Sequence, residues 1–338
     1  MLQRMTHRYP KTVLPAEWAE QSGMQLTWPH AKTDWAPCLK EVTETFVRLA
    51  QTIARHERLL VVTPEPEEVK RLLEIPDVIY LQLDTNDTWA RDHGPLTLLG
   101  PDGAEIVDFK FNGWGEKFPW QLDNAITRHL YDAGLLRGRY VDATDFVLEG
   151  GSIESDGEGT LLTTTHCLLA PHRNQPLGKA DIEDLLKKRL HAERVIWLDH
   201  GQIIGDDTDG HIDTMARLAP NRTIVYQGAE EGDEQFAELK AMEDELRETG
   251  YRLLRLPPPP LLTYDGERLP ATYANFVIIN GCVIVPTYGD EARDREAMAV
   301  IKEAFPDREI VGIDASVVVR QHGSLHCLSM QYPAGVIG

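Results

Sequence analysis

The sequence lacks the features that mark several large classes of protein. It has only four cysteines in 338 residues, and none of them forms a C-x-x-C pair. This spacing argues against a disulfide framework and against a structural zinc site, and it predicts a reducing, cytoplasmic compartment. The apolar runs are short as well. One of the longest, residues 276–286, is broken by Asn280 and Gly281 and falls far short of the roughly 20 residues of a membrane span.

Basic side chains are also scarce. There are 34 Lys and Arg against 54 Asp and Glu, which gives a formal net charge of −20. Nucleic-acid binding is therefore disfavoured, because phosphates need clustered Lys and Arg. The acidity suits a small cationic substrate, or it serves solubility alone. The first six residues lack the apolar core of a signal peptide, so we expect a cytoplasmic protein that does not bind a membrane.

The chain alternates between helical and strand-like patterns. Apolar spacing predicts helices at 37–55, 67–73, 122–131, 181–190, 233–249 and 292–305. Strands are expected at 59–62, 78–81, 96–99, 146–148, 160–164, 195–198, 223–226, 276–279, 282–285, 310–313 and 325–330. The strand at 96–99 should pair with 78–81, and Asn280-Gly281 is typical of a hairpin turn.

Five polar residues recur at nearly even spacing beside strand-like runs. They are Asp92, Glu149, His211, Asn275 and Cys327, with separations of 57, 62, 64 and 52 residues. A repeat of this length predicts a propeller or array, which would bring one polar residue from each unit to a common axis. We therefore expect one catalytic domain, 1–338, of about five α/β units. The alternative is a plain α+β domain.

The densest polar cluster spans residues 205–213. His211 and Asp213 are two residues apart, so on a strand they would share a face and pair proton transfer with charge binding. Two other interpretations are open: a divalent-metal site, which would make the chain a metal hydrolase, and a hydrogen-bonded turn without function.

Cys327 is the best candidate nucleophile among the cysteines. It follows Gly323-Ser324, where Gly323 lets the backbone approach a ligand, and His322 and His326 are near in sequence. Glu149 precedes two glycines and could orient His211, although a bulge or turn would explain the same pattern. Asp92 ends the loop that begins at Trp89, and it could simply pair with the neighbouring arginine.

Six motifs in this order resemble the agmatine deiminase branch of the guanidino-group-modifying enzymes. They are TNDTWARDHGP at 85–95, FNGWG at 111–115, LEGGSIE at 148–154, DDTDGHIDT at 206–214, RLPATYANF at 268–276 and GSLHC at 323–327. The likeness runs from about residue 10 to the C-terminus. One departure is visible: the segment 321–324 reads QHGS, where many relatives have a Gly-Gly-Asn version.

The resemblance implies a five-bladed α/β propeller, the pentein fold, with the active site on the central axis and no metal or cofactor. It makes Cys327 the nucleophile and His211 the general acid/base. Asp92 and Asp213 would grip a guanidinium, and Glu149 would support His211 or the substrate. Trp89 and Trp114 would line the pocket, and Asp207 or Trp89 could meet the distal amine.

The expected activity is hydrolysis of agmatine to N-carbamoylputrescine and ammonia, within putrescine and polyamine biosynthesis. Two carboxylates can bind the N–H edges of a guanidinium and fix its carbon near a thiolate. The alternatives are deimination of peptidyl-arginine or of free arginine. Free arginine would need a cation for its carboxylate, and Arg91 is the one obvious spare cation among the motif residues. Whether the chain forms a homo-oligomer is left open.

Overall fold

The strands form several small sheets rather than one large one. In the computed structural model, which describes residues 9–338, there are five sheets of three or four strands and one two-stranded ribbon. The expectation about a leader segment concerns residues 1–6, which lie outside the described part. The middle part of the chain forms three three-stranded sheets. Their strands are β4 (Leu96–Gly100), β5 (Gly103–Lys110) and β6 (Arg139–Val147); β7 (Ile153–Ser155), β8 (Thr160–Thr164) and β9 (Arg194–Leu198); and β10 (Ala216–Ala219), β11 (Thr223–Gln227) and β12 (Arg252–Leu256).

The remaining strands come from the last third of the chain and from its beginning. They are β15 (Val277–Ile279), β16 (Cys282–Thr287) and β17 (Glu309–Asp314); β18 (Ser329–Pro333), β1 (Gln21–Thr27), β2 (Arg58–Thr63) and β3 (Ile79–Gln82); and the ribbon β13 (Thr263–Tyr264) and β14 (Glu267–Arg268). In each of the five sheets the first two strands pair antiparallel and the third joins parallel to the second. One topology is thus used five times.

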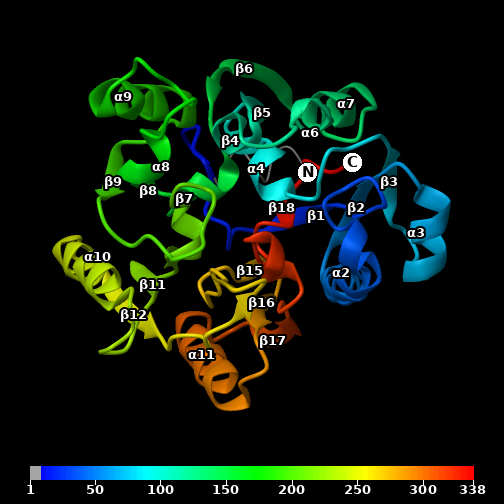
Figure 1. Ribbon diagram of the computed structural model, residues 1–338. Helices are drawn as coiled ribbons and strands as arrows, with labels where there is room; N and C mark the ends of the chain where they lie inside the picture. Colours follow the sequence, from blue (N-terminus) through cyan, green and yellow to red (C-terminus); the bar gives the residue numbers. More distant parts are fainter. Residues whose placement is uncertain (1–8) are drawn as a thin grey trace.

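One sheet is assembled from both ends of the chain. β18 pairs antiparallel with β1, with Met24 opposite Gln331 and Leu26 opposite Ser329. β2 then joins parallel to β1, and β3 extends the sheet. The N-terminal and C-terminal segments therefore lie side by side, and Figure 1 shows the five sheets following one another around the middle of the molecule.

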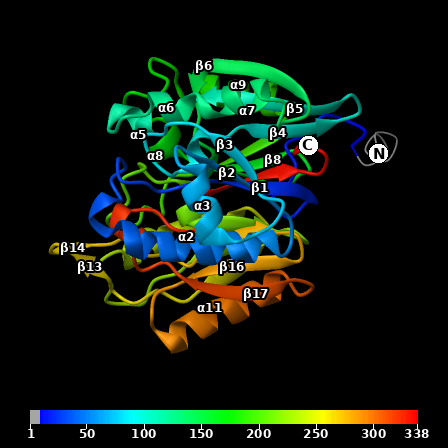
Figure 2. The ribbon, with the colours of Figure 1, turned by 90° about the vertical axis from the view of Figure 1, so that its right-hand side faces the viewer.

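Helices connect the parallel strands and lie on the outside, as a parallel crossover requires. The longer ones are α2 (Leu39–Ala54), α3 (Pro66–Leu73), α7 (Ile126–Asp132), α9 (Lys179–Leu190), α10 (Phe236–Glu248) and α11 (Glu291–Ala304). The short ones are α4 (Ala90–His93), α5 (Gly113–Glu116), α6 (Gln121–Asn124), α8 (Thr165–Leu168) and the 3-10 turns η1 (Ala36–Cys38), η2 (Gly150–Ser152), η3 (Ile212–Thr214) and η4 (Val318–Gln321). From the side, α7 and α9 cover one edge of the molecule and α11 the opposite edge (Figure 2).

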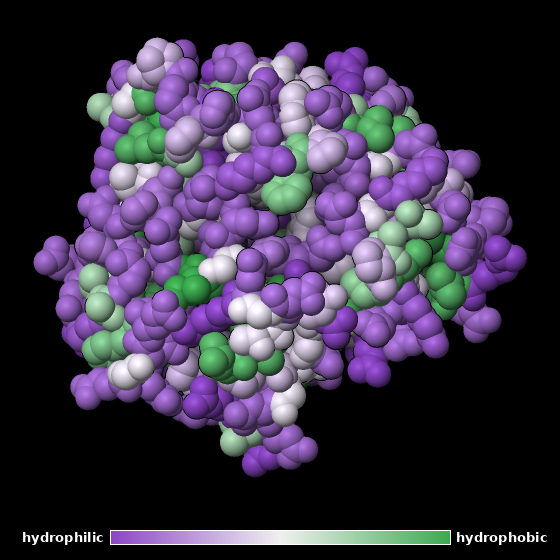
Figure 3. Space-filling model, viewed as in Figure 1, coloured by the Kyte–Doolittle hydropathy of each residue, from purple (hydrophilic) through white to green (hydrophobic). Residues whose placement is uncertain are grey.

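The apolar faces of these helices explain why the sequence pattern located them. In α2 the buried side chains Val42, Phe46, Leu49 and Ile53 recur at helical spacing, and they pack into a core shared with β15 and β16. The face of the molecule seen in Figure 3 is mostly hydrophilic, with small scattered apolar patches. Within residues 9–338, no helix combines the length and the apolar character that crossing a membrane requires.

The strand pairings support one expectation about neighbours and overturn another. The hairpin at Asn280-Gly281 is confirmed, because Ile279 pairs with Cys282 across that turn. The pairing of 78–81 with 96–99 is wrong. β3 joins β2 in parallel, whereas β4 pairs with β5 across the tight turn at 101–102. Two strands that follow each other in sequence here belong to different sheets, because the loop between them carries α4.

Candidate functional site

The five evenly spaced polar residues occupy equivalent places in the five sheets. Each lies just before the first strand of its sheet: Asp92 before β4, Glu149 before β7, His211 before β10, Asn275 before β15 and Cys327 before β18. The side chains are all buried. Because the sheets share one topology, this position faces the middle of the molecule each time.

Gly151 shows how closely three of these loops approach one another. A Cβ atom added there would lie 2.6 Å from His211 Nδ1, 2.9 Å from Asp92 Oδ1 and 3.0 Å from Asp213 Oδ2. Its backbone N–H donates to Asp92 Oδ1 at 3.0 Å. Only glycine leaves room here, so His211, Asp92 and Asp213 form one cluster around a bare stretch of backbone.

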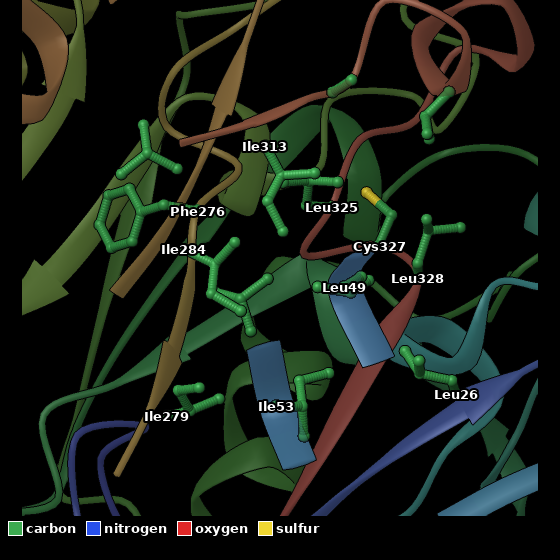
Figure 4. Close-up of a cluster of buried hydrophobic side chains, with 14 of the residues drawn as sticks. Leu26, Leu49, Ile53, Phe276, Ile279, Ile284, Ile313, Leu325, Cys327 and Leu328 are labelled. Carbon is green, nitrogen blue, oxygen red and sulfur yellow. The ribbon is translucent and has the colours of Figure 1, made fainter. Parts of the chain in front are cut away.

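Cys327 is held against this cluster by Asn275. The Asn275 Oδ1 atom accepts from the backbone N–H groups of His326 at 3.0 Å and Cys327 at 3.3 Å, and it lies 3.4 Å from Cys327 Sγ. The thiol also lies 3.8 Å from Asp213 Oδ2. In Figure 4 the flanking Leu325 and Leu328 are part of a buried apolar cluster with Leu49 and Ile53 of α2. A rigid core therefore fixes the position of the thiol.

The charges around Cys327 work against thiolate formation in the empty site. Burial raises the pKa of the Cys327 thiol well above its usual range, and Asp213 and Asp92 raise it further. Hydrogen bonds from Ser324 and with Asn275 oppose this effect without reversing it. A cation entering between the two carboxylates would remove the repulsion that they exert on a thiolate.

His211 lies in an anionic environment. Its Nδ1 is 3.5 Å from Asp92 Oδ1, and ligand atoms of His211, Glu149 and Cys167 lie within 4.8 Å of one another. Burial by itself would lower the pKa of His211, but Asp92, Cys167 and Asp213 together hold it well above the ordinary value. The imidazole is thus poised to carry a proton at neutral pH.

Each of the two aspartates is held by hydrogen bonds but can still accept more. Trp114 Nε1 donates to Asp92 Oδ2 at 2.9 Å, which fixes that side chain against an aromatic wall. His326 Nδ1 lies 2.7 Å from Asp213 Oδ2, while Asp213 Oδ1 is buried and has no hydrogen-bond partner among residues 9–338. Such a pair can accept N–H groups from a planar cation.

Glu149 has a partner that sequence reasoning did not identify. Both of its oxygens lie close to Arg173 Nε, at 3.0 and 3.2 Å, and both side chains are fully buried. Arg173 also donates to Asp209 Oδ2 at 2.6 Å and to the Thr208 carbonyl at 2.8 Å. Arg173 therefore ties Glu149 to the loop that carries His211.

A cavity of about 290 Å³ opens onto this cluster. It is lined by Cys327, Asp92, Trp89, Trp114, Asp207 and Gly323, together with Asp34, Asp87, Phe118, Thr208, Arg320, Gln321 and His322. A Cβ atom on Gly323 would lie 2.1 Å from the Trp89 ring, so this glycine is needed for the ring to pack beside the loop. The loop that departs from the family pattern is thus part of the cavity wall.

The acidic side chains at 206–209 do not form a metal-binding cluster. Asp206 accepts from Thr208 Oγ1 at 2.6 Å and from the Gly210 N–H at 2.7 Å, as in a hydrogen-bonded turn. Asp209 pairs with Arg173 and with Lys117. Asp207 alone faces the cavity, and burial together with Asp206 raises its pKa to about 6.

A second charged network lies behind the site, and the sequence analysis did not assign it. Arg217 pairs with Glu17 and Glu154 and donates to the Phe276 carbonyl. His326 Nε2 lies 2.8 Å from Glu17 Oε2. The one available signal was the histidine beside Cys327; Glu17 and Arg217 are 200 residues apart, and no local pattern links them.

Residues 13–333 match the model of the Porphyromonas-type peptidyl-arginine deiminases. A Vibrio parahaemolyticus relative with the provisional name agmatine deiminase is 34% identical, over 95% of this chain and 96% of its own. A cysteine-to-serine variant of C. jejuni agmatine deiminase, solved with substrate bound, is 40% identical with a TM-score of 0.91, and covers 95% of this chain and 96% of that one. A Porphyromonas gingivalis structure provisionally named arginine deiminase is 51% identical with a TM-score of 0.92, and covers 97% of this chain and 100% of its own.

More remote structures share only the fold. A dimethylarginine dimethylaminohydrolase is 11% identical with a TM-score of 0.52 over 92% of this chain. The closer matches span nearly the whole chain and nearly the whole of each relative. On this basis the chain has the α/β fold of these enzymes, and it belongs to the Porphyromonas-type peptidyl-arginine deiminase family.

Proposed function

We propose that this chain is an agmatine deiminase that hydrolyses the guanidinium of agmatine to N-carbamoylputrescine and ammonia. The observation that carries the proposal is the cavity, whose wall includes the Cys327 thiol, Asp92 and the further carboxylates Asp34, Asp87 and Asp207. Asp213 lies directly behind this wall, with Oδ2 3.8 Å from Cys327 Sγ and Oδ1 buried without a partner among the described residues. Relatives named for this activity, one of them solved with substrate bound, support it.

The proposal assigns a role to each residue of the site, and the distances given above support these roles. Asp92 and Asp213 bind the N–H edges of the guanidinium, which compensates its desolvation and holds its carbon near Cys327. The bound cation favours ionisation of Cys327, whose proton passes to solvent and later converts the released ammonia to ammonium, and the thiolate Sγ then attacks that carbon. His211 gives its proton to one amino group, which leaves as ammonia while the C–N bond breaks and an S-alkyl thiouronium remains. Water then attacks the same carbon, His211 takes up a proton, and the C–S bond breaks to release the ureido product and the thiol.

Glu149 acts in this scheme as a support for His211, held in place by Arg173. The two tryptophans, Trp89 and Trp114, form walls for the planar group and the alkyl chain. Gly323 keeps the loop close to Trp89. No residue of the mechanism requires a metal or a cofactor. The five sheets correspond to the blades of one five-bladed propeller, a single catalytic domain over 1–338. The polyamine-forming role, in a cytoplasmic setting, is part of the same proposal.

The distal end of the substrate distinguishes agmatine from arginine. Agmatine ends in an ammonium, and Asp207, Asp87 and Asp34 line the cavity. An arginine carboxylate would need a free cation. Arg91 does not serve, because it is buried and is not among the residues that line the cavity. Arg320 lines the cavity but pairs with Glu41 at 2.8 Å.

The test is ammonia release from agmatine, free arginine and a blocked arginine peptide, measured side by side with the wild type and with Cys327→Ala. Agmatine should be turned over best, and Cys327→Ala should release no ammonia from any of the three. Chelators should leave the rate unchanged, because the proposed mechanism uses no metal. A divalent-metal hydrolase would instead lose activity with EDTA and keep some activity in Cys327→Ala. If agmatine were the poorest of the three substrates, the specificity proposed here would be wrong.

A further inference from the structure

We propose that His326 and Glu17 are positioning residues that fix Asp213 for guanidinium binding, an inference that rests on the proposed function. The two oxygens of Asp213 have different surroundings. Oδ2 lies 2.7 Å from His326 Nδ1, whereas Oδ1 is buried without a partner among the described residues. A hydrogen bond to one oxygen restricts rotation of the carboxylate, so the other oxygen stays available to accept an N–H group from a cation.

His326 is itself fixed on its far side. Its Nε2 lies 2.8 Å from Glu17 Oε2, and the ring is 1% exposed. The same Nε2 also lies 3.0 Å from Arg217 Nη2. Because a guanidinium only donates, the two carboxylates are the acceptors that these contacts offer to the ring, and we infer that it donates to them from both nitrogens. The order Asp213, His326, Glu17 is therefore a chain of charge-assisted hydrogen bonds that runs away from the cavity.

Glu17 comes from the opposite end of the chain and is rigidly seated. Its Oε1 accepts from the Ile278 N–H at 2.8 Å, and its Oε2 also accepts from Arg217 Nη2 at 2.5 Å. Arg217 is fully buried and binds Glu154 on its other side. The only acceptor that these contacts offer to His326 Nε2 is Glu17, because a guanidinium cannot accept a hydrogen bond.

This network also keeps Asp213 negative. Burial alone would raise the pKa of Asp213, but the hydrogen bond and charge of His326, with His211 and Arg217, hold it below the ordinary value. Asp92, which has no such cationic chain behind it, has a raised pKa, mainly because of burial. The two carboxylates assigned to the guanidinium are thus unequal, because the pKa of Asp213 is lowered whereas that of Asp92 is raised.

Glu17 and Glu154 supply a matched pair of variants. Both are buried glutamates bound to Arg217, so Glu17→Gln and Glu154→Gln should both lower the thermal midpoint. Only Glu17 touches His326. In a Cys327→Ser background, calorimetric titration with agmatine should show Kd raised about tenfold or more by Glu17→Gln, and less than about threefold by Glu154→Gln. With the thiol intact, Glu17→Gln should raise KM more than it lowers kcat.

Equal effects of the two variants on Kd would overturn the proposal, since a purely structural role predicts them. A second measurement does not depend on the substrate. Protein labelled with [15N]histidine, without ligand, should show protons on both ring nitrogens of His326, assigned by their loss in His326→Asn, and Glu17→Gln should remove the Nε2 signal. A singly protonated ring in the wild type would also overturn it. If agmatine failed to bind the Cys327→Ser protein while both ring protons were seen, the proposed function would fail and the anchoring of Asp213 would stand.

Discussion

Asn275 Oδ1 lies 3.4 Å from Cys327 Sγ and 3.3 Å from the Cys327 backbone nitrogen. The same oxygen accepts from the His326 N–H, and Asn275 Nδ2 donates to the Asp213 carbonyl at 3.3 Å. One amide therefore joins the nucleophile loop to the loop of His211 and Asp213. The sequence placed Asn275 in the series of five but offered no function for it.

Replacing Asn275 by Ala should impair both stability and catalysis. The buried Cys327 N–H would lose its acceptor, at about 1–3 kcal/mol of folding free energy, and the thiol would lose its fixed position. The His326 N–H would keep only the backbone carbonyl of residue 275, at 3.2 Å. We expect a lower thermal midpoint and a kcat reduced by more than about tenfold, measured by ammonia release. Asn280→Ala is the control: it removes hydrogen bonds to Gln21 at 2.9 and 3.0 Å, away from the site. It should reduce stability but leave kcat near wild type; an equal fall in kcat would argue against a role for Asn275 at the thiol.

Gly151→Ala should abolish turnover. The added methyl would lie under 3.0 Å from His211 Nδ1 and Asp92 Oδ1, so at least one of them must move. A displacement of about 1 Å at a reacting group can cost about 100-fold in rate. Gly178→Ala, whose added Cβ would meet nothing closer than 3.7 Å, is the control and should retain activity. If Gly151→Ala turned over at the wild-type rate, and its crystal structure showed no rearrangement, the close approach of His211, Asp92 and Asp213 at this glycine would be contradicted.

Arg173 is expected to be essential for folding as well as for activity. Arg173→Met would leave Glu149 buried and unpaired, which costs about 3–5 kcal/mol. The double variant Arg173→Met with Glu149→Gln should recover part of the loss in thermal midpoint, because it removes the uncompensated charge. Arg189→Met breaks an ion pair with the exposed Asp145 and should cost about 1 kcal/mol or less. Similar losses for Arg173→Met and Arg189→Met would show that the buried pair contributes little.

The Cys327 thiol should be mostly protonated in the free enzyme. Burial, Asp213 and Asp92 all raise its pKa, so alkylation by iodoacetamide should be slow at neutral pH and still accelerating at alkaline pH. Asp92→Asn removes one of the raising charges and should shift the profile toward lower pH. Peptide mass spectrometry distinguishes Cys327 from Cys38, which is partly exposed. A pKa well below neutral in the substrate-free enzyme would disprove the idea that the bound cation helps to ionise the thiol.

Binding of the distal ammonium should depend on pH through Asp207. Its pKa is raised to about 6, so the carboxylate is charged above that pH and loses its charge as pH falls through it. The ratio of kcat/KM for agmatine to that for butylguanidine, which has no amine, should therefore fall as pH drops through about 6. Asp207→Asn should remove this change and leave any change centred near 7, where Asp87 titrates. A ratio unaffected by Asp207→Asn would place the amine elsewhere.

The sequence by itself determined the repeated unit and most of the residues of the candidate site. Apolar periodicity located the long helices and the hairpin at Asn280-Gly281, because a buried helical face such as that of α2 and a two-residue turn are local properties of the chain. The even spacing of the five polar residues has a related cause, because each of them precedes the first strand of a sheet with the same topology. They are Asp92, Glu149, His211, Asn275 and Cys327.

Only the tertiary structure decided which of these residues meet and what charges surround them. The closure of β18 on β1 joins the two ends of the chain, and it is this closure that brings Glu17 to His326. Arg173 reaches Glu149, and Arg217 reaches Glu17 and Glu154, through contacts that no sequence spacing encodes. A buried ion pair depends on the position of each partner in space, so the electrostatics of this site became visible only when the five sheets were placed around one centre.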